Sequence, residues 1–249
     1  MTDAARPWLS VVIPAYNESS RLGRGLEQVR DYAGRARGPI EVIVVDDGSR
    51  DDTSGVAERF APGPLTLRVL RNERNRGKGW SVRRGMLQAA GGLVLMSDAD
   101  FSAHIGEVEK LLQWAEAGFD VVIGSRDMPD SVLAPAQPWR RRWSARAFRT
   151  LRRHLVVGDL RDTQCGFKLF GREASRAVFS RLRVSNFAFD IEALVLARRL
   201  GLRIREVGVV WCNDPASRVR PVIDPLRMIV SLAGIAWRTR RPMPDPAGS

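Results

Sequence analysis

The stretch L-V-L-M-S-D-A-D, from Leu93 to Asp100, is the strongest indicator of the fold. A largely apolar run leads directly into a polar cluster that contains two carboxylates, Asp98 and Asp100. This pattern is typical of a buried strand that ends at the edge of a sheet, although its periodicity also fits a helix. Open α/β sheets bind their ligands at the carboxyl ends of the strands, so both aspartates are candidate site residues.

Two carboxylates separated by one residue provide the oxygen ligands that Mg²⁺ and Mn²⁺ prefer. In a turn that follows a strand, both side chains can reach one cation, which can also carry the phosphates of a substrate. The structural alternative is an Asp-rich turn that caps the next helix. The other motifs of the chain, described below, favour the metal site.

Composition limits the class of protein. The chain has 249 residues, 44% of them hydrophobic and 27% charged, so one domain with a full core is expected. Its 40 basic and 28 acidic residues give a net charge of +12, which favours a polyanionic partner: nucleic acid, an anionic membrane surface or a phosphorylated substrate. The two cysteines, Cys165 and Cys212, are interpreted as reduced cytosolic thiols. Neither a signal peptide nor a membrane-spanning run is expected.

Strand and helix patterns alternate through the first half of the chain. Strands are expected at residues 9–14, 40–45, 65–70, 93–97 and 120–124, with helices at 21–33, 53–60, 80–90 and 107–117. Such alternation predicts a mostly parallel sheet with helices on both faces.

The second half differs in character. Residues 138–157 carry seven arginines and no acidic residue, with apolar residues at helical spacing, which predicts a basic amphipathic helix. A loop that enters a strand is expected at 162–170, a helix at 187–199 and one strand at 202–211. A last helix at 223–237 is apolar but too short to span a bilayer, so an interfacial position is expected.

Seven motifs follow one another in a fixed order. The first four are I-P-A-Y-N-E from Ile13, V-V-D-D-G-S from Val44, N-R-G-K-G from Asn75 and S-D-A-D from Ser97. Together they resemble the nucleotide-sugar half of family-2 glycosyltransferases of the GT-A fold. The later G-S-R, D-T-Q-C-G-F-K-L-F and F-A-F-D-I-E motifs resemble prenyl-phosphate glycosyltransferases of the dolichyl-phosphate glucose synthase type. The resemblance covers residues 9–237.

This resemblance implies an α/β, Rossmann-like GT-A fold with a mostly parallel central sheet. It divides the chain into a tail at 1–8, one catalytic domain at 9–240 and a disordered tail at 241–249. Within the domain, 9–125 would bind the nucleotide sugar, 126–221 the acceptor, and 222–240 would form the amphipathic helix. The implied activity is inverting transfer of a hexose, with glucose favoured, from a UDP-sugar to polyprenyl or dolichyl phosphate. The implied location is peripheral, on the cytoplasmic face of a membrane.

The resemblance also implies roles on the donor side. Asp98 and Asp100 would bind Mg²⁺ or Mn²⁺ and act in catalysis. The nucleotide-sugar residues would be Pro14, Ala15, Tyr16, Glu18, Asp46, Asp47, Lys78, Asp98 and Ala99. Turn capping is the alternative for Asp46 and Asp47, and a surface position at a helix start is the alternative for Lys78.

On the acceptor side, the resemblance implies a cluster of cations around a phosphate, with Arg126 and Arg141 also counted as catalytic. The candidates are Arg126, Lys168, Arg218 and one of Arg140, Arg141 and Arg142, among which the spacing favours Arg141. A prenyl phosphate, with a second pKa of about 6 as in phosphorylated side chains, arrives ionised and needs no general base. Asp190, also counted as catalytic, could be a base, a group that supports a metal ligand or an orienting group. Because the acceptor is already ionised, the orienting role is favoured.

Three alternatives remain open from the sequence. A GDP-mannose donor, or another acceptor, is possible within the same enzyme class. The basic composition also fits a nucleic-acid-binding protein, although paired acidic motifs would repel a phosphate backbone and no nucleic-acid motif is present. The third is a catalytically inactive membrane-binding relative. Ser102 stands where mannose-type relatives often place a third metal ligand, which leaves the metal geometry open.

Overall fold

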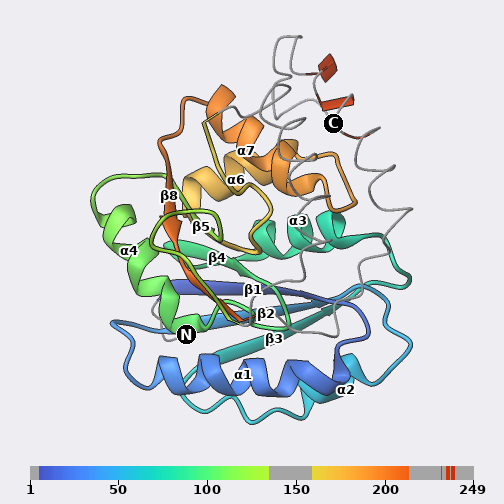
Figure 1. Ribbon diagram of the computed structural model, residues 1–249. Helices are drawn as coiled ribbons and strands as arrows, with labels where there is room; N and C mark the ends of the chain where they lie inside the picture. The colour runs from blue at the N-terminus through green and yellow to red at the C-terminus, as the bar shows by residue number, and fades with distance from the viewer. Residues whose placement is uncertain (1–5, 135–158, 213–230, 232–233, 236, 239–249) are drawn as a thin grey trace.

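The computed structural model describes residues 6–134 and 159–212, together with residues 231, 234–235 and 237–238 (Figure 1). The predicted site residues Arg141 and Arg218 lie outside the described residues. So do the arginine-rich segment, both predicted tails apart from residues 6–8, and most of the predicted last helix.

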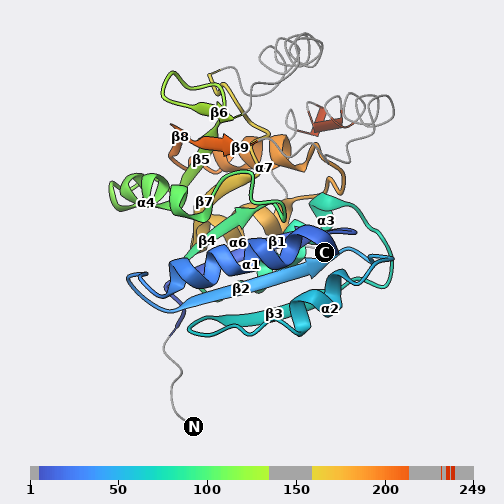
Figure 2. The same cartoon turned by 60° about the horizontal axis from the view of Figure 1, so that its bottom comes forward.

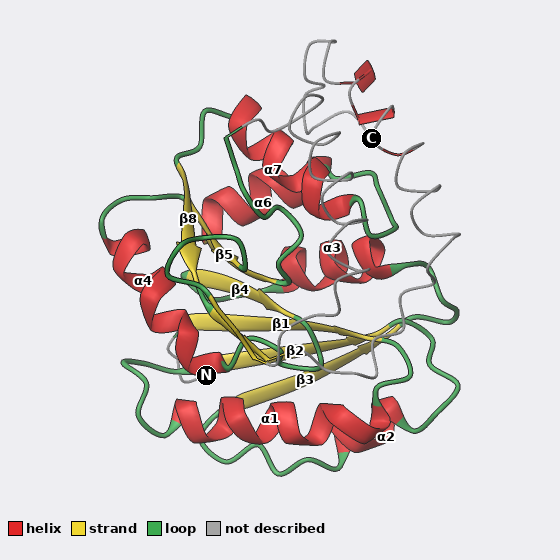
Figure 3. Cartoon of the chain, viewed as in Figure 1, coloured by secondary structure: helices red, strands yellow, loops and turns green. Residues whose placement is uncertain are grey.

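A seven-stranded sheet forms the centre of the molecule (Figure 3). Its spatial order is β3-β2-β1-β4-β7-β5-β8, and every neighbouring pair is parallel except the two that involve β7. The strands are β1 (Leu9–Ala15), β2 (Ile40–Asp46), β3 (Thr66–Arg71), β4 (Leu93–Ser97), β5 (Val121–Ser125), β7 (Phe167–Gly171) and β8 (Ile204–Gly208). The predicted α/β class with a mostly parallel sheet is confirmed.

Helices cover both faces of the sheet (Figures 1 and 2). Alternate residues of a strand point to opposite faces, so Val11 and Ile13 join one core cluster while Val12 joins the other. The first cluster is covered by α1 (Ser19–Ala33), α2 (Thr53–Glu58) and α4 (Val108–Glu116). The second is covered by α3 (Lys78–Gln88), α6 (Arg172–Arg181) and α7 (Phe189–Arg199). The near-continuous apolar runs of β1 and β2 follow from burial on both faces.

Two features of the second half differ from the sequence-based expectation. Residues 202–211 do not form one strand: β8 ends at Gly208, and β9 (Val210–Cys212) pairs with the short β6 (Val132–Ala134) in a separate sheet. No charged residue marks this break between Val207 and Trp211, and the partner strand β6 lies about 80 residues away in the sequence. The helix α6, between β7 and α7, is a further element that the pattern did not predict.

Two of the described residues in the last predicted helix contact the rest of the chain. Ile235 is buried in the second core cluster, and Ser231 accepts a hydrogen bond from Asn186 at 2.9 Å. Trp237 is 57% exposed. No helix in the described part of the chain is both long and apolar enough to cross a membrane.

Candidate active site

The carboxyl ends of β1, β2 and β4 lie side by side, because the three strands are parallel and adjacent. The backbone joins them there: Asp47 N donates to Ala15 O at 2.8 Å. The predicted donor residues at this edge include Pro14 and Ala15, which are buried at the end of β1. Tyr16 follows them and is 37% exposed, so the I-P-A-Y-N-E motif begins in the core and emerges at the surface.

Asp46 and Asp47 hold turns. Asp46 accepts from Ser49 N at 2.9 Å and from the Ser54 hydroxyl. Asp47 accepts from the Asn72 side chain at 2.8 Å, and from the backbone N–H groups of Arg76 and Gly77 at 2.9 and 2.8 Å. The turn-capping alternative therefore describes Asp46 well. A carboxylate can accept about four hydrogen bonds, so Asp47 retains capacity for one more donor.

The loop held by Asp47 delivers Lys78. Gly77 has a φ of 99°, which favours glycine, and an added Cβ would overlap the carbonyl of Ser185. Lys78 then begins α3, and its Nζ lies 2.6 Å from Asp98 Oδ1. The side chain is 21% exposed, so the surface alternative does not describe it. Burial would lower the pKa of Lys78, but the charges of Asp98 and Asp190 outweigh it and raise the pKa.

Asp98 and Asp100 are held in the turn after β4. Asp98 N donates to Gly166 O at 3.1 Å, and Asp100 accepts from Ser102 N at 3.0 Å. Between these acids and Ser102, Phe101 has a φ of 47° and buries its ring in the core. Burial and then the charge of Asp98 raise the pKa of Asp100, so the two carboxylates act on each other.

The donor set fits a divalent cation. Asp98 Oδ1 is buried and lies against an ammonium group, so the site already attracts positive charge at this oxygen. No cluster of three or more His, Cys, Asp or Glu side chains that could hold a metal occurs among the described residues. A cation bound by Asp98 and Asp100 would therefore take its other ligands from phosphates and water, which is the usual coordination of Mg²⁺.

A second buried ion pair lies behind this turn. Lys168, on β7, is 1% exposed, and its Nζ donates to Asp190 and to Cys165 O. Asp190 lies in the first turn of α7. Burial raises the pKa of Asp190, opposed by the charges of Lys168 and Lys78. The predicted phosphate ligand Lys168 is thus enclosed and occupied by a carboxylate.

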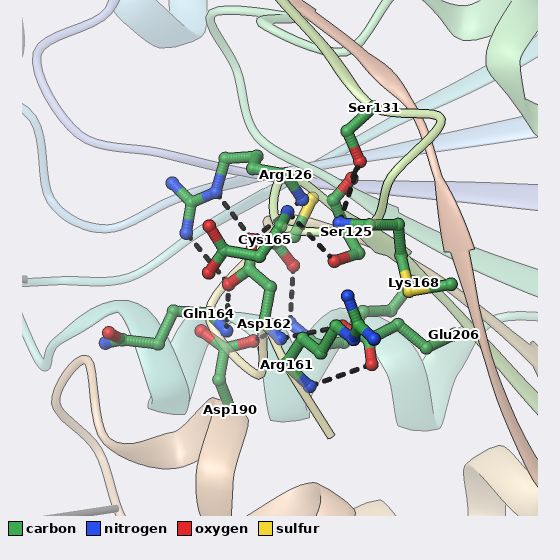
Figure 4. A network of polar contacts seen from close by, with 12 residues as sticks. Ser125, Arg126, Ser131, Arg161, Asp162, Gln164, Cys165, Lys168, Asp190 and Glu206 are labelled. Atoms are coloured by element: carbon green, nitrogen blue, oxygen red, sulfur yellow. Dashed lines mark hydrogen bonds and ion pairs between the residues drawn. The ribbon is translucent and has the colours of Figure 1, made fainter. Parts of the chain in front are cut away.

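Arg126, directly after β5, is held by Asp162 (Figure 4). Its Nε donates to Oδ2 at 2.7 Å, and its Nη2 donates to Oδ1 at 3.0 Å. Burial opposes both charges, but the ion pair outweighs it: the pKa of Asp162 lies below its ordinary value, and the pKa of Arg126 lies above its own. The Arg126 side chain remains 28% exposed.

One short segment, residues 162–168, joins these groups. Asp162 binds Arg126, Lys168 binds Asp190, and Gly166 packs so closely on Asp98 that an added Cβ would overlap its carboxylate. Asp98, Asp190 and Arg126 therefore belong to one connected arrangement.

Asp162 and Gly166 were missing from the predicted site, although both belong to the quoted D-T-Q-C-G-F-K-L-F motif. An acid at the start of a motif that also supplies the predicted phosphate ligand Lys168 is the signal that could have found Asp162. Cys165, in the same segment, is buried, and burial with the charge of Asp162 raises its pKa to about 12, so it remains a thiol.

The remaining predicted donor residues lie near the same turns. Glu18 forms an ion pair with Arg21 at 2.6 Å, and its backbone N–H donates to Thr53. Ala99, between Asp98 and Asp100, is buried.

Comparison with known proteins decides the family. The model of glycosyl transferase family 2 matches residues 10–179, which is more than half of the chain. The chain belongs to glycosyl transferase family 2. The predicted resemblance to family-2 glycosyltransferases is thereby confirmed, and the chain is a glycosyltransferase enzyme.

Individual relatives give a more specific comparison than the family model. The dolichyl-phosphate beta-glucosyltransferase of Mus musculus is 37% identical, and the match covers 96% of this family-2 chain and 80% of that protein. The Saccharomyces cerevisiae protein of the same name is 33% identical, and the match covers 90% of this chain and 73% of that protein. Glucosyl-3-phosphoglycerate synthase from Mycobacterium tuberculosis, solved with Mn²⁺, UDP and glucosyl-3-phosphoglycerate, superposes with a TM-score of 0.66 at 26% identity. That match covers 97% of this glycosyltransferase and 82% of the solved chain.

Proposed function

We propose that this family-2 glycosyltransferase transfers glucose from UDP-glucose to dolichyl phosphate or another polyprenyl phosphate. The observation that carries the proposal is the contact of residues 162–168 with Asp98, Asp190 and Arg126 together. The relatives named above support glucose and dolichyl phosphate as substrates, and the solved complex with Mn²⁺ and UDP supports a UDP-sugar and a divalent cation.

On the donor side, the first motif would hold the nucleoside through Pro14, Ala15, Tyr16 and Glu18, with Ala99 beside it. The remaining acceptor capacity of Asp47 suits the N–H of a uracil ring. Asp98 and Asp100 would hold Mg²⁺ or Mn²⁺, which when bound stabilises negative charge on the departing UDP.

Electrostatics support the need for that cation. Three cations of the site are each paired with a carboxylate: Lys78 with Asp98, Lys168 with Asp190, and Arg126 with Asp162. Asp100 remains as an additional carboxylate. Since these groups provide no net positive charge, the charge that balances a diphosphate and a phosphate must come from a metal ion or from other basic residues.

On the acceptor side, a phosphate oxygen attacks C1 of the sugar, the new C1–O bond forms, and the C1–O bond to UDP breaks. Attack from the side opposite to UDP inverts the anomeric centre. No proton must be removed, because a phosphate monoester with a second pKa of about 6 is mostly dianionic near neutral pH. Arg126 would bind this phosphate, and Arg141 and Arg218 are further candidates. Given its burial, Lys168 would orient Asp190, and Asp190 in turn would orient Lys78.

A peripheral site of action at the cytoplasmic face of a membrane is part of the proposal. Its support is the net charge of +12, which attracts anionic lipid.

A donor panel tests the function. Radiolabelled UDP-glucose, UDP-galactose and GDP-mannose would each be offered with polyprenyl phosphate and Mn²⁺ or Mg²⁺. We expect transfer from UDP-glucose alone, and loss of transfer in Asp98→Asn and Asp100→Asn. The control Asp52→Asn removes the acid of an exposed pair with Arg59 and should retain activity. Transfer from GDP-mannose would support the alternative donor, and near-normal turnover of either site variant would refute the metal-site assignment.

A further inference from the structure

The carboxylate of Asp162 is completely occupied. Oδ2 accepts from the backbone N and from Nε of Arg126, at 3.1 and 2.7 Å. Oδ1 accepts from Nη2 of Arg126 and from Gln164 N, at 3.0 and 3.1 Å. These four hydrogen bonds use the whole acceptor capacity of a carboxylate. Asp162 is also only 4% exposed in its side chain, so it cannot itself bind a substrate.

The backbone at Arg161 and Asp162 is held by a side chain of β8. Glu206, on β8, accepts from Asp162 N at 2.7 Å and from Arg161 N at 2.8 Å (Figure 4). β8 pairs with β5, the strand that leads into Arg126. The acid and the arginine are therefore anchored to neighbouring strands, which limits the freedom of each relative to the other.

The guanidinium of Arg126 is restrained on two sides. Asp162 occupies the edge formed by Nε and Nη2, and the central carbon of the guanidinium lies over the Trp211 ring, 5.1 Å from its centroid. Nη1 has no acceptor among the residues that the structure describes. At this end of the guanidinium, one N–H of Nη1 and the outer N–H of Nη2 are parallel. Together they can hold a phosphate through two parallel hydrogen bonds.

We propose that Asp162 is a positioning residue that presents the Nη1 end of Arg126 to the acceptor phosphate. This inference rests on the proposed function, because it takes the phosphate role of Arg126 from there. The pair carries no net charge, so Arg126 selects the acceptor by hydrogen-bond geometry, and a rotated guanidinium loses that selection even though its charge is unchanged.

A double-mutant cycle tests this role. Asp162→Asn, Arg126→Ala and the double variant would be assayed with a short-chain, water-soluble polyprenyl phosphate at saturating UDP-glucose. The amide that Asp162→Asn introduces would direct N–H groups at existing donors and release the guanidinium. We expect the acceptor KM to rise on the order of tenfold, as for loss of one hydrogen bond to a charged group. The affinity for UDP, measured by calorimetry, should stay within about twofold, a difference worth less than one hydrogen bond. In the Arg126→Ala background, Asp162→Asn should add no further change.

Other outcomes separate this inference from the proposed function. The positioning role would be wrong if the effects of the two substitutions on the acceptor KM multiply in the double variant. It would also be wrong if Asp162→Asn weakened UDP binding by the same factor as it raised the acceptor KM. In both cases the acceptor role of Arg126 stands. An unchanged acceptor KM in Arg126→Ala would overturn that acceptor role and the inference with it. Asp162→Glu retains the charge but displaces the guanidinium by one methylene, so it decides the question if Asp162→Asn does not fold: an intermediate KM supports positioning, and a normal KM refutes it.

Discussion

At the scale of single residues, the space left by Gly166 determines where Asp98 can lie. The Asp98 carboxylate occupies the volume that a side chain at position 166 would need. A residue with no side chain therefore shapes the proposed metal site more directly than several charged residues nearby.

We predict that Gly166→Ala displaces Asp98 and lowers kcat/KM for glucose transfer by about 100-fold, the effect of a misplacement near 1 Å. Steady-state kinetics and a thermal melt on the same sample would measure it. The matched control is Gly171→Ala, whose Cβ would lie 3.7 Å from Asp120 O, an ordinary contact. Normal transfer by Gly166→Ala would show that the position of Asp98 is not critical.

At the scale of elements, the pair of Asp162 and Arg126 ties the segment before β7 to the end of β5. In the folded chain the pKa of Asp162 lies below its ordinary value, because the charge of Arg126 outweighs burial. The ionised form therefore stabilises the fold. This stability is present above the unfolded pKa of about 4 and is lost as the pH falls toward the folded pKa.

We therefore predict that the difference in Tm between wild type and Asp162→Asn is large at about pH 7 and smaller at about pH 3. Scanning fluorimetry across this range would measure it. Asp52→Asn, which removes an exposed partner of Arg59, is the control and should leave Tm nearly unchanged at both values. The same Tm difference for Asp162→Asn at both pH values would contradict an ionic contribution.

The elements themselves were largely predictable, because the central strands are continuous apolar runs buried on both faces. The expected strand at 40–45 corresponds to β2, and the expected helix at 21–33 corresponds to α1. The strand β6 escaped prediction because Val132 and Leu133 are exposed and its partner β9 is distant in sequence. The burial of a side chain was equally hard to predict. The sequence identifies Lys168 as a cation, but only the fold shows that it is enclosed with Asp190.

At the scale of the whole molecule, the net positive charge of the chain does not come from the paired groups of the site. The paired groups of the site carry no net positive charge, while the chain as a whole carries +12. The excess of basic residues must therefore act elsewhere, which is consistent with attraction to an anionic surface.

We predict that the protein co-sediments with vesicles that contain anionic lipid, and that binding falls steeply as the salt concentration rises to about 0.5 M, where the Debye length is only a few ångströms. Neutral phosphatidylcholine vesicles are the control. Equal binding to both kinds of vesicle would contradict an electrostatic attachment.

The place of β7 also sets the time at which the molecule can fold. β4 and β5 are synthesised first, but β7 lies between them in the sheet, so neither has its neighbour until residue 171 has left the ribosome. A nascent chain of about 130 residues would leave one edge of β4 and both edges of β5 unpaired, because β8 also follows later in the sequence, and unpaired edges are prone to pairing with other chains. A ribosome pause before β7, or the binding of a chaperone to the nascent chain at that stage, would therefore affect the yield of active enzyme.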